Sequence, residues 1–139
     1  MDDCSGGGLC ENQQCVAMAC LNRAPGKTGI RAKFLVTLYV GMIHGRNGDH
    51  EQLYATIANL LWAHDRSIVV QSQEMQVDMN VKSSIDPSGL PNEIPLAPGT
   101  VYEAEGEYID PAVATGGKAV VHFTHSTCGY VTINGTTYQ

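Results

Sequence analysis

Alternation of apolar and polar side chains is the clearest pattern in the chain, and it predicts β-strands. In residues 75–82 every second side chain is apolar, which is typical of a strand with one buried face. Residues 101–109 have the same period, with glutamates on one side and tyrosines on the other. Residues 118–125, which follow the Gly116-Gly117 loop, are predicted to form another strand.

Two more segments complete the predicted sheet. Residues 33–43 are apolar at both alternating sets of positions, which predicts a central strand that is buried on both faces. Near the C-terminus, Asn134-Gly135 lies between two β-prone runs and predicts a type I′ hairpin. In that hairpin Val131 would lie opposite Tyr138.

One segment follows a helical period instead. Asp49 would cap its N-terminus, with Gln52 at the capping-box position. We therefore expect a helix over residues 50–64, from His50 to His64, that packs against the sheet. Its buried stripe would consist of Leu53, Ile57, Leu60, Leu61 and His64.

These elements predict one domain of the α+β class, mainly antiparallel β. Residues 1–29 would form a cysteine-rich N-terminal arm and linker, and residues 30–139 a single β-rich domain with a proline-rich loop over 83–100. About five strands and one packed helix fit two architectures. One is a small Greek-key barrel of the oligonucleotide/oligosaccharide-binding (OB) type, and the other is a curled open sheet with the helix across it.

The N-terminal arm holds four cysteines and little apolar material: Cys4, Cys10, Cys15 and Cys20. Such a segment buries too little surface to offset its ordering entropy, so cross-links or a metal must constrain it. The spacing lacks the paired C-x2-C units of common zinc sites, which favours disulfides. A structural metal and free thiols are the alternatives. The sequence assigns no partner to the fifth cysteine, Cys128.

Disulfides favour an extracytoplasmic protein, periplasmic or secreted. No secretory leader is visible at the N-terminus, so we expect that a leader has been removed from this chain. We expect no membrane span, because no apolar run reaches the ~20 residues that a spanning helix needs.

The formal net charge of −6 argues against a dedicated nucleic-acid binder. Basic residues are nevertheless concentrated between Arg23 and Arg46, where no acidic residue occurs. Such a basic edge could contact a phosphate or an anionic surface, although a solvated strand flank is the simpler explanation.

His122, His125 and Cys128 form an H-x2-H-x2-C motif, which provides three donors that zinc accepts. His44 or His50 could supply a fourth ligand. In a regular strand the two motif histidines point to opposite faces, so chelation requires the strand to end or bulge near Thr124. The alternative is a structural histidine pair. A Cys128 thiolate could also act as a nucleophile, but a disulfide is the favoured interpretation of this cysteine.

The last forty residues carry a second pattern: Gly106-Glu107-Tyr108, then Gly116-Gly117 followed by His122-Phe-Thr-His125, then a hairpin with Gly129-Tyr-Val and Gly135-Thr-Thr-Tyr138. This order resembles the bacterial domain of unknown function 3465 family. The resemblance implies a compact, exported β domain with a histidine-bearing strand, and the family supplies no activity. Ser126-Thr127-Cys128 departs from the family's Asp-Pro segment, and neither the cysteine arm nor the helix matches it.

The first functional hypothesis is a noncatalytic, exported binding or structural module. Its surface near His122, Thr124, Glu107 and Tyr108 would hold a small ligand, a glycan or a partner protein. No catalytic residue is assigned by the sequence.

Two alternatives remain. One is a zinc-dependent hydrolase, such as a nuclease, that uses His122, His125 and either Cys128 or His50, with Glu107 as the base. The other is a self-associating structural subunit that joins neighbours through exposed edge strands.

Overall fold

A computed structural model of the chain describes residues 3–4, 8–11, 14–16, 24–46, 48–125 and 128–139. In the N-terminal arm, β1 (Asp3–Cys4), β2 (Gly8–Glu11) and β3 (Gln14–Val16) form a small antiparallel sheet in that order. The predicted disulfides of Cys4, Cys10, Cys15 and Cys20 lie outside the described side chains.

The second sheet contains seven strands. Its strands are β4 (Lys27–Gly45), β5 (Gly48–Ala63), β6 (Met75–Val81), β7 (Val101–Ile109), β8 (Val120–His122), β9 (Tyr130–Ile133) and β10 (Thr136–Tyr138). A short 3-10 helix, η2 (Arg66–Ile68), lies in the connection between β5 and β6. β4 begins at Lys27, slightly before the domain boundary predicted at residue 30.

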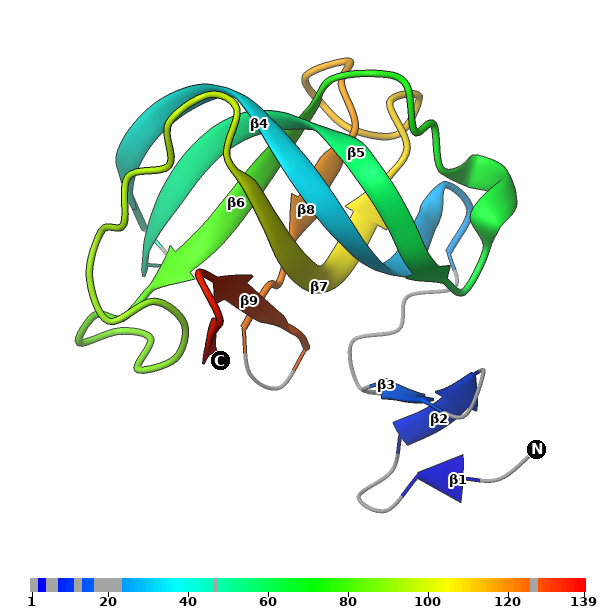
Figure 1. The fold of residues 1–139 in the computed structure, drawn as a ribbon, viewed down its shortest axis with the longest axis horizontal. Coiled ribbons are helices and arrows are strands. Elements are labelled where there is room, and N and C mark those ends of the chain that lie inside the picture. The colour runs from blue at the N-terminus through cyan, green and yellow to red at the C-terminus, as the bar shows by residue number, and fades with distance from the viewer. Residues whose placement is uncertain (1–2, 5–7, 12–13, 17–23, 47, 126–127) are drawn as a thin grey trace.

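Five of these strands close into a barrel (Figure 1). β4, β5 and β6 form an antiparallel meander, and β6 then pairs in parallel with β8. β8 also pairs antiparallel with β7, and β7 pairs antiparallel with β4, which closes the barrel. The predicted small barrel is therefore confirmed, and the sheet is closed rather than open.

The predicted helix over 50–64 is wrong, because this segment is strand β5. Glu51, Leu53, Ala55 and Ile57 all point into the barrel and alternate with more exposed neighbours, which is the β period. Two of these four inward positions are a carboxylic acid and an alanine, so the alternation is hard to recognise in the sequence. Leu60 and Leu61 also fit a helical period by coincidence, which favoured the wrong prediction.

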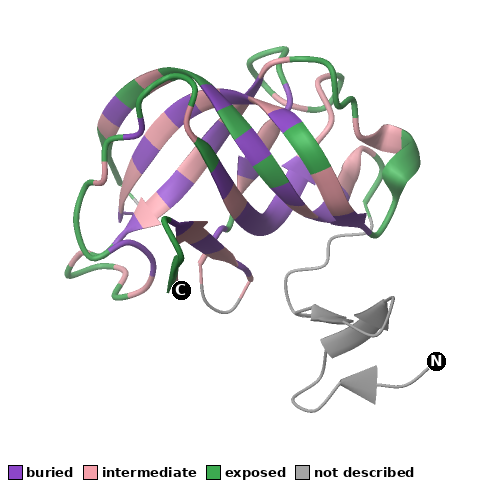
Figure 2. Cartoon of the chain, in the orientation of Figure 1, coloured by how far each residue is buried: buried purple, intermediate pink, exposed green. Residues whose placement is uncertain are grey.

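The prediction that residues 33–43 are buried on both faces is also wrong. Alternate residues of β4 do reach the core, as the banding in Figure 2 shows, but the other face is open to solvent. Leu38 is 52% exposed, and Leu35, Val40 and Ile43 are exposed as well. The long strand curls around the barrel through several register shifts against β5, so one face stays outside throughout.

The barrel interior is filled by apolar side chains from every strand of the barrel. Met75, Val77, Met79 and Val81 are all buried, as the alternation in β6 predicted. The loop between β6 and β7 adds Leu90 and Leu96 to the same core: the cluster also includes Phe34, Leu53, Tyr102, Tyr108 and Val121.

The C-terminal hairpin has the predicted register, with Val131 opposite Tyr138. Asn134 and Gly135 both have positive φ angles, 51° and 81°, as a type I′ turn requires. β9 pairs with the first half of β7, on the edge that β8 uses further along. Within the described part of the chain, no helix has the length and apolar character that crossing a bilayer requires.

We expect Ile133→Asp to abolish cooperative folding, because Ile133 is buried against the core and an unpaired buried carboxylate costs several kcal/mol. Thr136→Asp in the same hairpin is the matched control, since Thr136 is exposed and should tolerate the charge. Thermal melts followed by circular dichroism would compare the two. A cooperative Ile133→Asp melt near the wild-type temperature would show that the hairpin does not pack as described.

Candidate functional site

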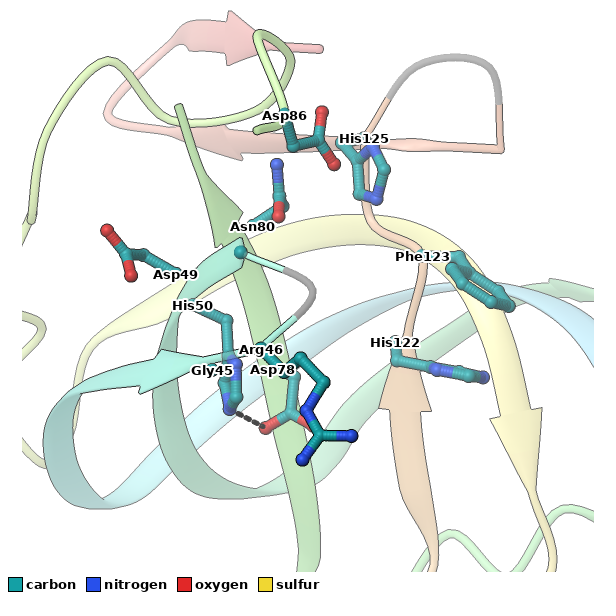
Figure 3. Close-up of a pocket in the computed structure, with 11 residues that line it drawn as sticks. Gly45, Arg46, Asp49, His50, Asp78, Asn80, Asp86, His122, Phe123 and His125 are labelled. Carbon is teal, nitrogen blue, oxygen red and sulfur yellow. Dashed lines mark ion pairs between the residues drawn. The ribbon is translucent and has the colours of Figure 1, made fainter. Parts of the chain in front are cut away.

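An open cleft of about 410 Å³ lies on the outer surface of the barrel, next to the turn between β4 and β5. Figure 3 shows its walls, which come from that turn, from the end of β6, from the following loop and from the end of β8. Most of its lining is polar or charged: Gly45, Arg46, Gly48, Asp49, His50, Asp78, Asn80, Asp86, His122, Phe123 and His125.

Strand alternation explains why polar side chains gather here. β6 buries its apolar residues and therefore turns Gln76, Asp78 and Asn80 outward. Its pairing with β5 sets His50 directly opposite Asn80, so His50 and Asp78 are diagonal neighbours. The His50 Nε2 and Asp78 Oδ1 atoms are 3.8 Å apart, the contact dashed in Figure 3.

Burial raises the pKa of the Asp78 carboxyl above its ordinary value. His50 and His122 act against this shift, and so does the Gln76 amide, which donates to both carboxylate oxygens at 3.1 Å. Asp78 is therefore a carboxylate that other side chains already hold in one orientation.

A buried glutamate, Glu107, holds the ring of His122 in place. The His122 Nε2 atom lies 2.7 Å from Glu107 Oε1, and the Glu107 side chain is only 4% exposed. A carboxylate only accepts hydrogen bonds, so Nε2 carries the proton and Nδ1 is the ring atom facing away from this bond. The pairing of His122 with Glu107 across β8 and β7 sets this contact.

Phe123 directly follows β8, which ends at His122, and its ring stacks on the His122 ring. Its φ angle of 57° is in the left-handed region, which is uncommon for a residue with a Cβ. The ring centroids of Phe123 and His122 are 3.9 Å apart with an interplanar angle of 24°. The strand therefore ends before Thr124, as chelation by His122 and His125 would require. This ending instead places the exposed ring of Phe123 at the cleft.

A hydrogen-bonded chain holds the loop after β6 against the end of β8. Ser88 Oγ donates to Asp86 Oδ1 at 2.7 Å and lies 2.9 Å from His125 Nδ1. The serine hydroxyl has one proton, so its oxygen accepts from the Nδ1–H of His125. Both Asp86 and His125 line the cleft, and Ser88 sets their separation.

The predicted ligand-binding residues divide into two groups. His122 lines the cleft, with Glu107 beneath it. Thr124 and Tyr108 are buried, so the expectation that they contribute to an accessible surface needs correction. Thr124 Oγ1 donates to the Asp78 carbonyl at 3.1 Å, and the Tyr108 hydroxyl accepts from Val70 N at 3.2 Å. Both therefore stabilise the barrel wall.

The predicted zinc ligands are near one another without forming a coordination sphere. His50, His122 and His125 all line the cleft, yet each ring has a partner of its own: Asp78, Glu107 and Ser88 respectively. Among the residues that the structure describes, no group of three histidine, cysteine, aspartate or glutamate side chains converges to hold a metal. Cys128 is disulfide-bonded, which excludes it as a thiolate nucleophile in this state.

The three glutamates of β7 share the outer face of the strand, and each contacts a partner there. Glu103 accepts from the Tyr130 hydroxyl, and Glu105 is 2.8 Å from Arg31 Nη2. Burial raises the Glu105 pKa, which Arg31 opposes. With Glu107 bound to His122, this row is structural.

Sequence reasoning missed Arg46, Asp78, Asp86 and Phe123 as cleft residues. A signal for the cleft was present in Asn47-Gly48, because Asn-Gly between β-prone runs is typical of a hairpin. The helix predicted over residues 50–64 starts directly after this pair, and that prediction moved β5 and its side chains out of the expected sheet.

Comparison of the chain with protein-family models, with curated proteins and with solved structures finds no match. Its function is therefore argued from the cleft itself.

We expect His122→Ala to lower the free energy of unfolding by about 2 kcal/mol, because it leaves the buried Glu107 carboxylate without its ring partner. His44→Ala is the matched control. His44 makes a similar 2.9 Å contact with Asp49 but is 77% exposed, so its loss should cost at most about 0.5 kcal/mol. Urea denaturation measures both values, and equal effects would contradict a buried role for the His122–Glu107 pair.

Proposed function

We propose that this chain is an exported, noncatalytic binding domain whose ligand occupies the cleft beside the β4–β5 turn. The observation that carries the proposal is the row of fixed polar side chains across three strands. His50, Asp78 and His122 stand on β5, β6 and β8; hydrogen bonds hold Asp78 and His122 before any ligand arrives, and His50 Nε2 lies 3.8 Å from Asp78 Oδ1. Such preorganisation lowers the entropic cost of binding.

The strand order supports this location. Numbered from β4, the barrel strands lie in the order one, two, three, five, four, with strand one closing against strand four. We assign this order to the OB type of barrel. In such barrels the face of strands two and three, with the loop between strands one and two, is the usual ligand surface. Here those strands are β5 and β6.

The chemistry of the cleft fits a hydroxyl-rich ligand such as a glycan. Carboxylates, imidazoles and the Asn80 amide offer both hydrogen-bond acceptors and donors, and hydroxyl groups can use both. Phe123 is 43% exposed and presents an apolar ring face at the rim. Nucleic acid is disfavoured because Asp49, Asp78 and Asp86 line the same cleft and the net charge is −6.

Export rests on the cysteine content. Four cysteines in a short arm and a disulfide at Cys128 favour an oxidising compartment. We accordingly place the domain outside the cytoplasm, periplasmic or secreted.

We expect a panel of neutral disaccharides to hexasaccharides to include at least one that shifts backbone amide resonances around the cleft. The ¹⁵N-labelled protein would be titrated with each saccharide and, in parallel, with single-stranded oligothymidine. The responding amides should be those of Gly48, Asp78 and His125. Oligothymidine binding at the cleft, without any saccharide binding there, would contradict the proposed ligand class.

Matched variants test whether the cleft is the site. Asp78→Asn and Phe123→Ala should each weaken saccharide binding at least about fivefold, since each loses contacts worth on the order of 1 kcal/mol. Val101→Ala is the control, because Val101 is an exposed apolar residue that does not line this cleft. Unchanged affinity in both cleft variants would place binding elsewhere.

A further inference from the structure

The loop between β6 and β7 contains a segment, residues 91–99, that we call the strap. It is pinned at both ends by backbone hydrogen bonds. Just before it, Leu90 N donates to Asn80 O at 2.8 Å, and at its end Gly99 N donates to Val36 O at 2.8 Å. Between these points Leu96 is buried in the core and Ile94 packs against it. The strap is therefore part of the barrel's cover.

The centre of the strap is held by Glu51, which points into the barrel from β5. Glu51 is 0% exposed, and its Oε1 accepts from Ile94 N at 2.7 Å. Its other oxygen, Oε2, is buried and has no hydrogen-bond partner among the described residues, and the same holds for the Tyr102 hydroxyl. A carboxylate with one unsatisfied buried oxygen is costly, whereas the protonated acid gains a donor.

Every titratable group that interacts with Glu51 in the described part of the chain is itself an acid. Glu93 on the strap adds a negative charge, while Tyr39 on β4 and Tyr102 on β7 are phenols whose own pKa values Glu51 helps to raise. Tyr39 donates to Glu93 rather than to Glu51. Burial is the main cause that raises the pKa of Glu51 to about 7, and the Ile94 amide opposes it only in part.

We propose that Glu51 is a proton-operated clip, which holds the strap on the barrel when protonated and releases it when ionised. The contact between Glu51 Oε1 and Ile94 N is the clip, and the pinned ends at Leu90 and Gly99 confine the opening to the segment between them. The clip is independent of any ligand in the cleft.

The direction of the pH dependence follows from linkage. In the open strap Glu51 meets water and titrates near its ordinary value of 4.5, whereas in the closed strap its pKa is about 7. The closed state therefore binds the proton more tightly and is most favoured below about pH 4.5. Its advantage falls tenfold for each pH unit between these two values and levels off above about 7, roughly three hundredfold in all.

Hydrogen exchange at the Ile94 amide tests the clip directly, because this amide makes the proposed contact. Protection factors, corrected for the intrinsic exchange rate, would be measured in the full chain between pH 5 and 8. We expect wild-type protection at Ile94 to fall about tenfold per pH unit up to pH 7 and then to level off. Amides of β6 exchange by global unfolding, whose pH dependence includes the same Glu51 linkage, so they should be more strongly protected than Ile94 at every pH; this difference in absolute protection separates strap opening from global unfolding.

Two variants sharpen the test. Glu51→Gln keeps an oxygen for the Ile94 amide and cannot ionise, so its Ile94 protection should be independent of pH. Glu74→Gln removes a carboxylate that lies on the barrel exterior beside Lys118, and it should behave as wild type. Wild-type protection at Ile94 that stays flat or rises with pH would overturn the proposal, and so would a Glu51→Gln profile that follows the wild type.

Discussion

The rest of the structure depends on one short strand, β8, pairing with two neighbours at once. Val121 lies opposite Val77 of β6 in parallel and opposite Tyr108 of β7 in antiparallel orientation. This double pairing closes the barrel and leaves these five strands without a free edge between β6 and β7. The close approach needs glycine at position 106, because a Cβ there would overlap the His122 carbonyl oxygen. Thr124 extends the contact by its bond to the Asp78 carbonyl.

The same closure creates the cleft. His122 stands on β8, between β7 and β6. It therefore contacts Glu107 of β7 on one side and interacts electrostatically with Asp78 of β6 on the other. In an open sheet, one of these two neighbours would be missing. The candidate function therefore follows from the topology, and the polar row is one of its consequences.

The sequence predicted those parts of the fold in which one face is apolar and the other polar. β6 has this simple alternation and its buried face was predicted correctly, and the C-terminal hairpin has the predicted register. In β7 the strand was predicted, but Tyr108 was expected at an accessible surface and is buried. β5 was missed because Glu51 occupies a core position that a periodicity argument assigns to an apolar residue. β4 was misjudged because its outer residues Leu38 and Val40 are apolar although they are exposed. Local pattern cannot reveal either exception, since burial is decided by strands distant in sequence.

The cleft was only partly predictable for the same reason. The histidines at 50, 122 and 125 stood out by residue type, and all three line it. Their partners did not stand out, because Asp78 and Ser88 reach them through the pairing of β6 and the course of its loop. The histidine motif suggested chelation, whereas the neighbouring strands and the loop after β6 give each ring a separate polar partner.

The most direct test of this topology is a set of nuclear Overhauser contacts from the backbone of Val121. Barrel closure predicts contacts from Val121 to the backbones of both Val77 and Tyr108 in the same sample. Contacts to only one of the two strands would mean that the sheet is open, and His122 would then lack either Asp78 or Glu107 as a neighbour.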